Sequence, residues 1–130
     1  MRWLTLDEIL HIHQRVIETT GGEQGVLSLS ALEASLFRPL ASFEGVDAFS
    51  DFLEKIAALI HGIITSHPFV DGNKRVALVA ADVCLRMNGM RIRPSSEVEE
   101  FFWAIARGER DVNAIAQWLR TAVETIPTTD

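Results

Sequence analysis

The feature that most constrains this fold is a pair of strongly apolar segments separated by a short polar stretch. Residues 50–66 contain FLEKIAALIHGIITS, which after its first turn is apolar around most of the helical circumference, as in a helix that runs through a core. Residues 76–89, VALVAADVCLRMNG, also have the composition of a buried helix and end in Gly89, a residue suited to a left-handed C-terminal cap. We predict two buried helices joined by residues 67–75, HPFVDGNKR.

Capping signals and helical periodicity predict further helices on both sides of this pair. Residues 5–8, TLDE, have the form of a capping box, and apolar residues at helical spacing follow them. The same signature at residues 30–33 and 96–99 predicts two shorter helices, and the apolar periodicity of residues 111–126 predicts a last helix.

The remaining segments favour connections rather than strands. Residues 39–50 are irregular in composition and predict a loop or a small flap, while residues 91–94 predict an extended connector. A chain of 130 residues is about one domain long. We therefore expect an all-α fold, a compact bundle of about six helices in a single domain spanning residues 1–130.

The charge of the chain disfavours one class of partner. It has 12 Lys and Arg against 18 Asp and Glu, a formal net charge of -6, and no long basic run. Binding nucleic acid through its phosphates needs a broad cationic surface. We therefore expect no nucleic acid as direct substrate, which also disfavours an RNA-cleaving activity.

The sequence predicts a cytoplasmic protein with no membrane association. Its first residues reach acidic and polar side chains too early for a signal peptide, and its apolar runs are too short to span a bilayer. The single cysteine, Cys84, cannot form an internal disulfide and lies among apolar residues, where we expect a buried thiol.

The polar stretch has the composition of an anion site. A helix that begins near Gly72 and Asn73 offers backbone N–H groups without partners and a positive dipole, both of which favour a phosphate. Gly72 allows close approach of the backbone, while Lys74 and Arg75 supply a point charge and a planar fork for phosphate oxygens. We predict a polyphosphate site.

The remaining residues of the stretch supply the chemistry. Asp71 is suited to Mg²⁺, which proteins hold through one or two carboxylates together with substrate phosphates. His67 can accept the proton of an attacking hydroxyl as a general base. Pro68 and Phe69 are expected to position the loop, the first by restricting its backbone and the second by entering the core. Together these residues indicate phosphoryl or nucleotidyl transfer.

A plain connector is the alternative interpretation. An Asp-Gly-Asn turn between two helices, followed by solvated Lys and Arg, needs no function. Lys74 and Arg75 are nevertheless unfavourable for the dipole in the first turn of a helix. From composition alone, both interpretations remain open.

The stretch closely resembles the signature of the Fic/Doc family, which in the death-on-curing (Doc) branch is His-x-Phe-x-Asp/Asn-Ala/Gly-Asn-Lys-Arg. Every position of that signature is matched, and the resemblance extends through the early LDEILHIH and GGEQG segments and through both apolar helices. The matching residues are His67, Phe69, Asp71, Gly72, Asn73, Lys74 and Arg75. The family fold that the resemblance implies is also all-α.

The resemblance implies a role for each residue. His67 resembles the base that activates a target hydroxyl, Asp71 the Mg²⁺ ligand, and residues 72–75 the anion-binding cradle. Lys74 resembles the Doc branch, where it is associated with an inverted nucleotide and transfer of the terminal phosphate, whereas AMP-transferring Fic enzymes carry Gly there.

The implied activity is that of a Doc-type toxin, a kinase that uses Mg²⁺ and a nucleoside triphosphate, ATP, to phosphorylate a Ser/Thr hydroxyl of translation elongation factor Tu and so stops protein synthesis. The HPF sequence and Gly72 also resemble the AMP-transferring branch, so AMP transfer stays an alternative. A catalytically idle module that binds nucleotide or antitoxin is another.

The resemblance also implies a partner. Many Fic proteins are inhibited by a helix with the pattern Ser/Thr-x-x-x-Glu-Gly/Asn. The one Glu followed by Gly or Asn here is Glu44, and Leu40 occupies the position of the required hydroxyl, so the pattern is absent. We expect a separate, Phd-like antitoxin.

Other polar and aromatic residues favour structural roles. His11 and His13 lie two positions apart on a predicted helix and point in different directions, which disfavours a shared metal site and predicts an exposed His11 and a packed His13. Helical spacing and the lack of a basic groove favour core packing for the tryptophans, which are Trp3, Trp103 and Trp118.

Overall fold

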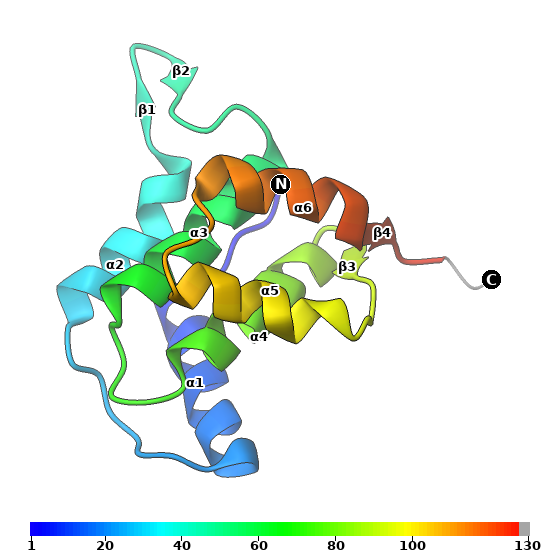
Figure 1. Cartoon of the computed structure of the whole chain (residues 1–130). Coiled ribbons are helices and arrows are strands. Elements are labelled where there is room, and N and C mark those ends of the chain that lie inside the picture. Colours follow the sequence, from blue (N-terminus) through cyan, green and yellow to red (C-terminus); the bar gives the residue numbers. More distant parts are fainter. Residues whose placement is uncertain (128–130) are drawn as a thin grey trace.

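The computed structural model describes residues 1–127 and consists mainly of helices (Figure 1). The α-helices are α1 (Leu6–Thr20), α2 (Leu29–Phe37), α3 (Phe52–Ser66), α4 (Asn73–Arg86), α5 (Glu97–Ala106) and α6 (Val112–Ala122). A short 3-10 turn, η1 (Arg38–Leu40), follows α2. The predicted helical bundle is confirmed. Of the predicted domain, residues 1–130, the last three lie outside the described residues.

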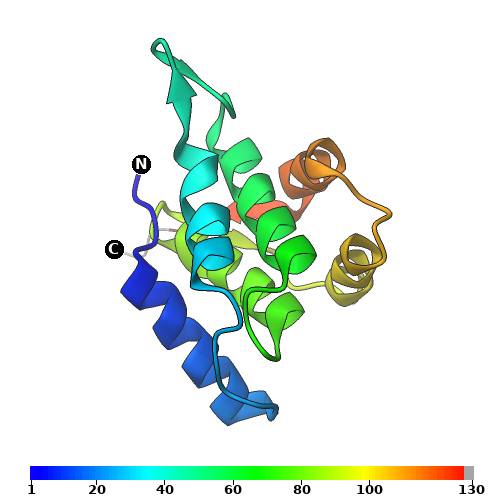
Figure 2. The same cartoon turned by 90° about the vertical axis from the view of Figure 1, so that its left-hand side faces the viewer.

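Helix α3 is the centre of the bundle. It packs against α2, α4 and α6, and helices surround it in both views (Figures 1 and 2). Its buried side chains include Ile56, Leu59, Ile60 and Ile63, each with no exposed surface. Removing this apolar surface from water is the main stabilisation of the bundle. Helix α3 ends before a left-handed cap residue, His67, whose N–H donates to the carbonyl of Ile63. The polar loop therefore leaves the core at a defined point.

The capping predictions have mixed outcomes. The box at the start of α1 is confirmed, because Thr5 Oγ1 accepts from the N–H of Glu8 at 3.2 Å and Glu8 Oε1 accepts from the N–H of Thr5 at 2.8 Å. The box at residues 30–33 is wrong, since Ser28 caps α2. The box at residues 96–99 is also wrong, since Ser95 rather than Ser96 accepts a bond from the first turn of α5.

Residues 1–127 contain four short strands, so the expectation of no strands is wrong. Strand β3 (Met90–Ile92) pairs antiparallel with β4 (Val123–Thr125), so the predicted connector at residues 91–94 is partly a strand and the predicted last helix ends at Ala122. Thr125 and Val123 are β-branched, and Pro127 disfavours helical backbone just before it. Ion pairs from Arg91 and Arg93 to Glu124 tie the two strands together.

The predicted loop or flap at residues 39–50 contains the other pair of strands. Strands β1 (Ser42–Phe43) and β2 (Val46–Asp47) form an antiparallel hairpin that projects from the helices (Figure 2). Lys55 is the first buried residue of α3, and it holds this hairpin to the helix through an ion pair with Asp47 at 3.2 Å.

Two further expectations concern Cys84 and membrane-spanning segments. Cys84 is buried as predicted, and its burial raises the pKa of the thiol to about 11. Within residues 1–127, no helix combines the length and apolar character needed to cross a bilayer.

Candidate active site

The polar stretch forms a short loop whose two ends both have unusual backbone geometry. Helix α3 ends at Ser66, and the cap residue after it, His67, is exposed and left-handed with φ 49°. Helix α4 begins after Gly72, which is left-handed with φ 78° and provides no side-chain cap. Left-handed backbone is uncommon outside glycine and is frequent at functional sites, so His67 is marked by its conformation as well as by its type.

The interior of the loop is closed by Phe69 and Asn73. Phe69 has no exposed surface, which confirms that it enters the core. The amide of Asn73 donates to the carbonyl of Phe69 at 2.9 Å and accepts from its N–H at 3.0 Å. The side chain of Asn73 is therefore directed into the loop, and what α4 presents at this point is backbone.

A second support is the segment that connects α1 to α2. The N–H groups of Leu27 and Ser28 donate to the carbonyl of Pro68 at 2.8 and 3.1 Å, and Val70 donates to the carbonyl of Gly25 at 3.0 Å. Both views show this segment running beside the loop (Figures 1 and 2). Because these bonds join backbone to backbone across forty or more residues, they are hard to infer from the sequence.

A third support is His13 of α1. It is buried, as predicted, and its ring is stacked on Phe69 with 4.0 Å between centroids and 5° between planes. Its Nε2 lies 2.9 Å from the carbonyl oxygen of Asp71. A carbonyl only accepts, so Nε2 carries the hydrogen and donates it.

Asp71 lies at the surface with its carboxylate held on one side. Its Oδ1 accepts from the N–H of Gly72 at 3.1 Å and its Oδ2 from the N–H of Glu23 at 3.2 Å. Within the part of the chain that the structure describes, no three metal-ligating side chains gather. One exposed carboxylate with unused lone pairs fits a Mg²⁺ held mostly by substrate oxygens, and does not fit an all-protein metal cage.

The two cations of the stretch have different surroundings. The Arg75 guanidinium donates to the Thr20 hydroxyl and to the Gly21 carbonyl, so it is directed at the end of α1. The Lys74 ammonium lies 3.6 Å from the ring centroid of Trp103. Trp103 is 47% exposed, so the prediction of core packing is wrong for this tryptophan.

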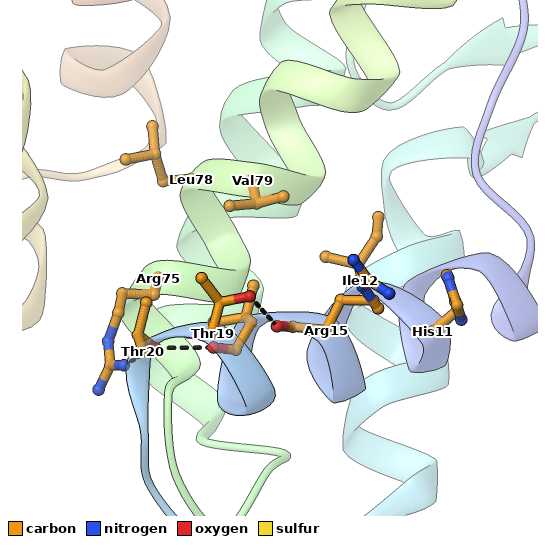
Figure 3. Close-up of a pocket in the computed structure, with 9 residues that line it drawn as sticks. His11, Ile12, Arg15, Thr19, Thr20, Arg75, Leu78 and Val79 are labelled. Atoms are coloured by element: carbon orange, nitrogen blue, oxygen red, sulfur yellow. Dashed lines mark hydrogen bonds between the residues drawn. The ribbon is translucent and has the colours of Figure 1, made fainter.

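A groove of about 420 Å³ lies beside Arg75, between α1 and α4 (Figure 3). The apolar side chains that line the groove include Val16 and Leu78. Arg15 also lines the groove and is its second cationic residue beside Arg75. Figure 3 shows Arg75 and Thr20 side by side at one end of the groove, where the Arg75 guanidinium donates to the Thr20 hydroxyl. The groove is therefore separate from the exposed His67 but shares Arg75 with the polar stretch.

Comparison with known sequences decides the family. The sequence model described as Fic/DOC family matches residues 3–85, more than half of the chain. The chain belongs to the Fic/DOC family. The matched part of this Fic/DOC chain contains α1, the segment after it, the loop and most of α4, which are the elements that build the site.

Two curated relatives are similar to this Fic/DOC chain over most of their length. One is "Toxin Doc" of Mycolicibacterium smegmatis, 36% identical over 99 residues that cover 74% of this chain and 76% of the relative. The other is "Protein kinase doc" of Escherichia phage P1, 31% identical over 120 residues that cover 92% of this chain and 94% of the relative.

In this family member, the predicted site residues lie on one loop and the first turn of the helix after it. His67 and Asp71 are exposed there, and the backbone N–H groups that begin α4 lack intrahelical partners. Phe69 is buried as predicted, and Pro68 beside it is buried as well. Sequence reasoning missed the contacts of His13 and Trp103, because each lies far along the chain from the residue it touches.

Proposed function

We propose that this chain is a Doc-type toxin that transfers the terminal phosphate of ATP to a Ser/Thr hydroxyl of elongation factor Tu and so inhibits translation. The observation that carries the proposal is the placement of an exposed His67 and an uncapped N-terminus of α4 at the two ends of one firmly held loop. The relative named "Protein kinase doc" supports phosphate transfer as the reaction.

The proposed reaction assigns one task to each end of the loop. The free N–H groups and the positive dipole at the start of α4 hold the phosphates, with Lys74 as an added charge. The target hydroxyl oxygen attacks the terminal phosphorus, the bond from that phosphorus to the bridging oxygen breaks, and the nucleoside diphosphate leaves. His67 takes the hydroxyl proton as general base.

Mg²⁺ is the proposed cofactor, and Asp71 is the residue that would hold it. When bound, the ion would offset the negative charge of the phosphates. Without it, the Asp71 carboxylate repels them. The bonds that Asp71 accepts from Gly72 and Glu23 fix its direction without using all of its lone pairs.

A separate Phd-like antitoxin is the proposed restraint, and the name "Toxin Doc" of one relative is in keeping with such a pair. The groove between α1 and α4 fits an antitoxin segment with apolar side chains and flanking carboxylates, because its wall is apolar and Arg15 and Arg75 are cationic.

Val79, which is 37% exposed in this groove, provides a test of the proposed antitoxin contact. Val79→Glu is expected to weaken antitoxin binding more than tenfold and to leave transfer to elongation factor Tu unchanged.

AMP transfer is the second candidate, because Pro68 and Gly72 resemble the AMP-transferring branch. It uses the same base and the same cradle but breaks the bond at the innermost phosphorus. A catalytically idle module is disfavoured by His67, since binding a nucleotide needs no base.

The test is intact mass spectrometry of elongation factor Tu after incubation with this protein, Mg²⁺ and ATP. We expect a gain of one phosphate, its loss with His67→Ala, and unchanged nucleotide affinity in that variant. His61→Gln is the matched control, because His61 is half-buried on the same helix, outside the loop. A gain of one AMP would support the second candidate, and no change in mass would refute both.

A further inference from the structure

Lys74 and Trp103 form a contact that the proposed reaction does not yet use. The Lys74 ammonium, in the first turn of α4, lies 3.6 Å from the centroid of the indole, which belongs to α5. Helices α4 and α5 pack against each other, so the contact joins two elements of the core rather than two mobile segments.

The group that contacts the Lys74 ammonium decides whether this ammonium can still bind an anion. Among residues 1–127, no carboxylate pairs with Lys74, whereas Lys55 and Arg86 each pair with one and Arg107 pairs with two. A carboxylate would neutralise the ammonium. The face of an indole attracts a cation through its quadrupole without cancelling its net charge. Trp103 thus fixes Lys74 and leaves its positive charge for an anion.

The exposure of Trp103 indicates that core packing does not explain it. The indole is 47% exposed, while the adjacent Phe102 is only 2% exposed and lies in the core. The contact also offsets an unfavourable placement, because a cation in the first turn of a helix opposes the dipole. A long lysine side chain otherwise loses much rotamer freedom when it binds a ligand, and holding it in advance reduces that loss.

We propose that Trp103 is a positioning residue that holds the Lys74 ammonium ready for the outer phosphates of the bound nucleotide. This inference rests on the proposed function, since it concerns the same cradle. Trp103 acts through Lys74 and on phosphate, so the nucleoside part of the ligand is not needed for its effect.

The test compares the wild type, Trp103→Ala, Trp103→Phe, Lys74→Met and the double variant Trp103→Ala/Lys74→Met by calorimetric titration. The probes are ATP and inorganic tripolyphosphate, each with Mg²⁺. We expect Trp103→Ala to weaken both by about two- to fivefold, in line with an exposed cation–π contact. Trp103→Phe should recover most of the affinity, and Trp103→Ala should cause no further loss in the Lys74→Met background.

Phe37→Ala is the matched control, because Phe37 is a similarly exposed aromatic residue, 45% exposed, on α2. The inference is overturned if Trp103→Ala weakens ATP alone, which would indicate stacking on the base, or if it acts equally with Lys74→Met present. Absence of binding of both probes to the wild type would overturn the proposed function, and this inference with it. Thermal unfolding of each variant checks that it is folded.

Discussion

His13 donates a hydrogen bond from Nε2 to the backbone carbonyl of Asp71 at 2.9 Å while its ring is stacked on Phe69. One buried side chain of α1 therefore contacts the loop at two points, one on each side of Val70. His67 lies before Phe69 and α4 starts after Asp71, so His13 supports the loop between the proposed base and the proposed anion site.

Replacing His13 by Phe should separate the two contacts, because Phe keeps a stacked ring and removes the donor. We expect a loss of about 1 kcal/mol of unfolding free energy, measured by urea denaturation, as the Asp71 carbonyl loses its partner. Transfer activity should fall as well, since the loop is no longer fixed. His11→Phe, at an exposed position of the same helix, should stay within about 0.5 kcal/mol of the wild type. Equal losses in the two variants would contradict the role of His13.

The substitutions Gly22→Ala and Gly21→Ala form a matched pair that tests the role of Asp71. A Cβ on Gly22, at φ 117°, would lie 2.9 Å from Asp71 Oδ2, while one on Gly21, at φ 86°, would meet nothing within 4 Å. Both alanine variants should lose about 1–3 kcal/mol through backbone strain. Only Gly22→Ala should also displace the carboxylate and raise the Mg²⁺ concentration needed for half-maximal transfer. An unchanged Mg²⁺ dependence in Gly22→Ala would argue against Asp71 as the metal ligand.

Asn73→Ala should test whether the buried amide holds the loop. The substitution leaves the N–H and the carbonyl of Phe69 without partners inside the fold, so we expect a loss of about 2–4 kcal/mol in chemical denaturation. Asn113→Ala on α6 is the control, because that asparagine is exposed, and a change below about 0.5 kcal/mol is expected. A similar small change in Asn73→Ala would show that the loop is held by its other contacts.

Glu124, which pairs with Arg91 and Arg93, should make the stability of the folded protein depend on pH. Hydrogen bonds from Arg91 and then Arg93 lower the pKa of its carboxyl below the usual value. A folded-state pKa below the unfolded one adds stability above about pH 4.3, and this stability is lost as the pH falls through the lowered pKa. The unfolding midpoint of the wild type should fall more steeply on acidification than that of Glu124→Gln. Parallel pH profiles would contradict the assignment.

Local signals predicted much of this molecule, and long-range contacts account for most of what they missed. The capping box at Thr5 is formed within one helical turn, so the sequence predicts it. The pairing of β3 with β4 joins residues more than thirty positions apart, and no periodicity in so short a segment reveals it.

The site follows the same division. Its candidate residues could be found in the sequence because the nine residues from His67 to Arg75 are contiguous. Their arrangement could not be found there, because His13 and Trp103 come from helices that only tertiary packing brings to the loop. The exposure of Trp103 was missed for a related reason, since apolar spacing on a short helix does not tell which face meets the core.

The most direct test of terminal phosphate transfer is transfer of label from ATP to elongation factor Tu, with the radioactive phosphorus placed either at the terminal or at the innermost phosphate. We expect label from the terminal position alone, and we expect the labelling to be abolished by His67→Ala and retained by His61→Gln. Label from the innermost position, or equal labelling with His67→Ala, would contradict terminal phosphate transfer with His67 as the base.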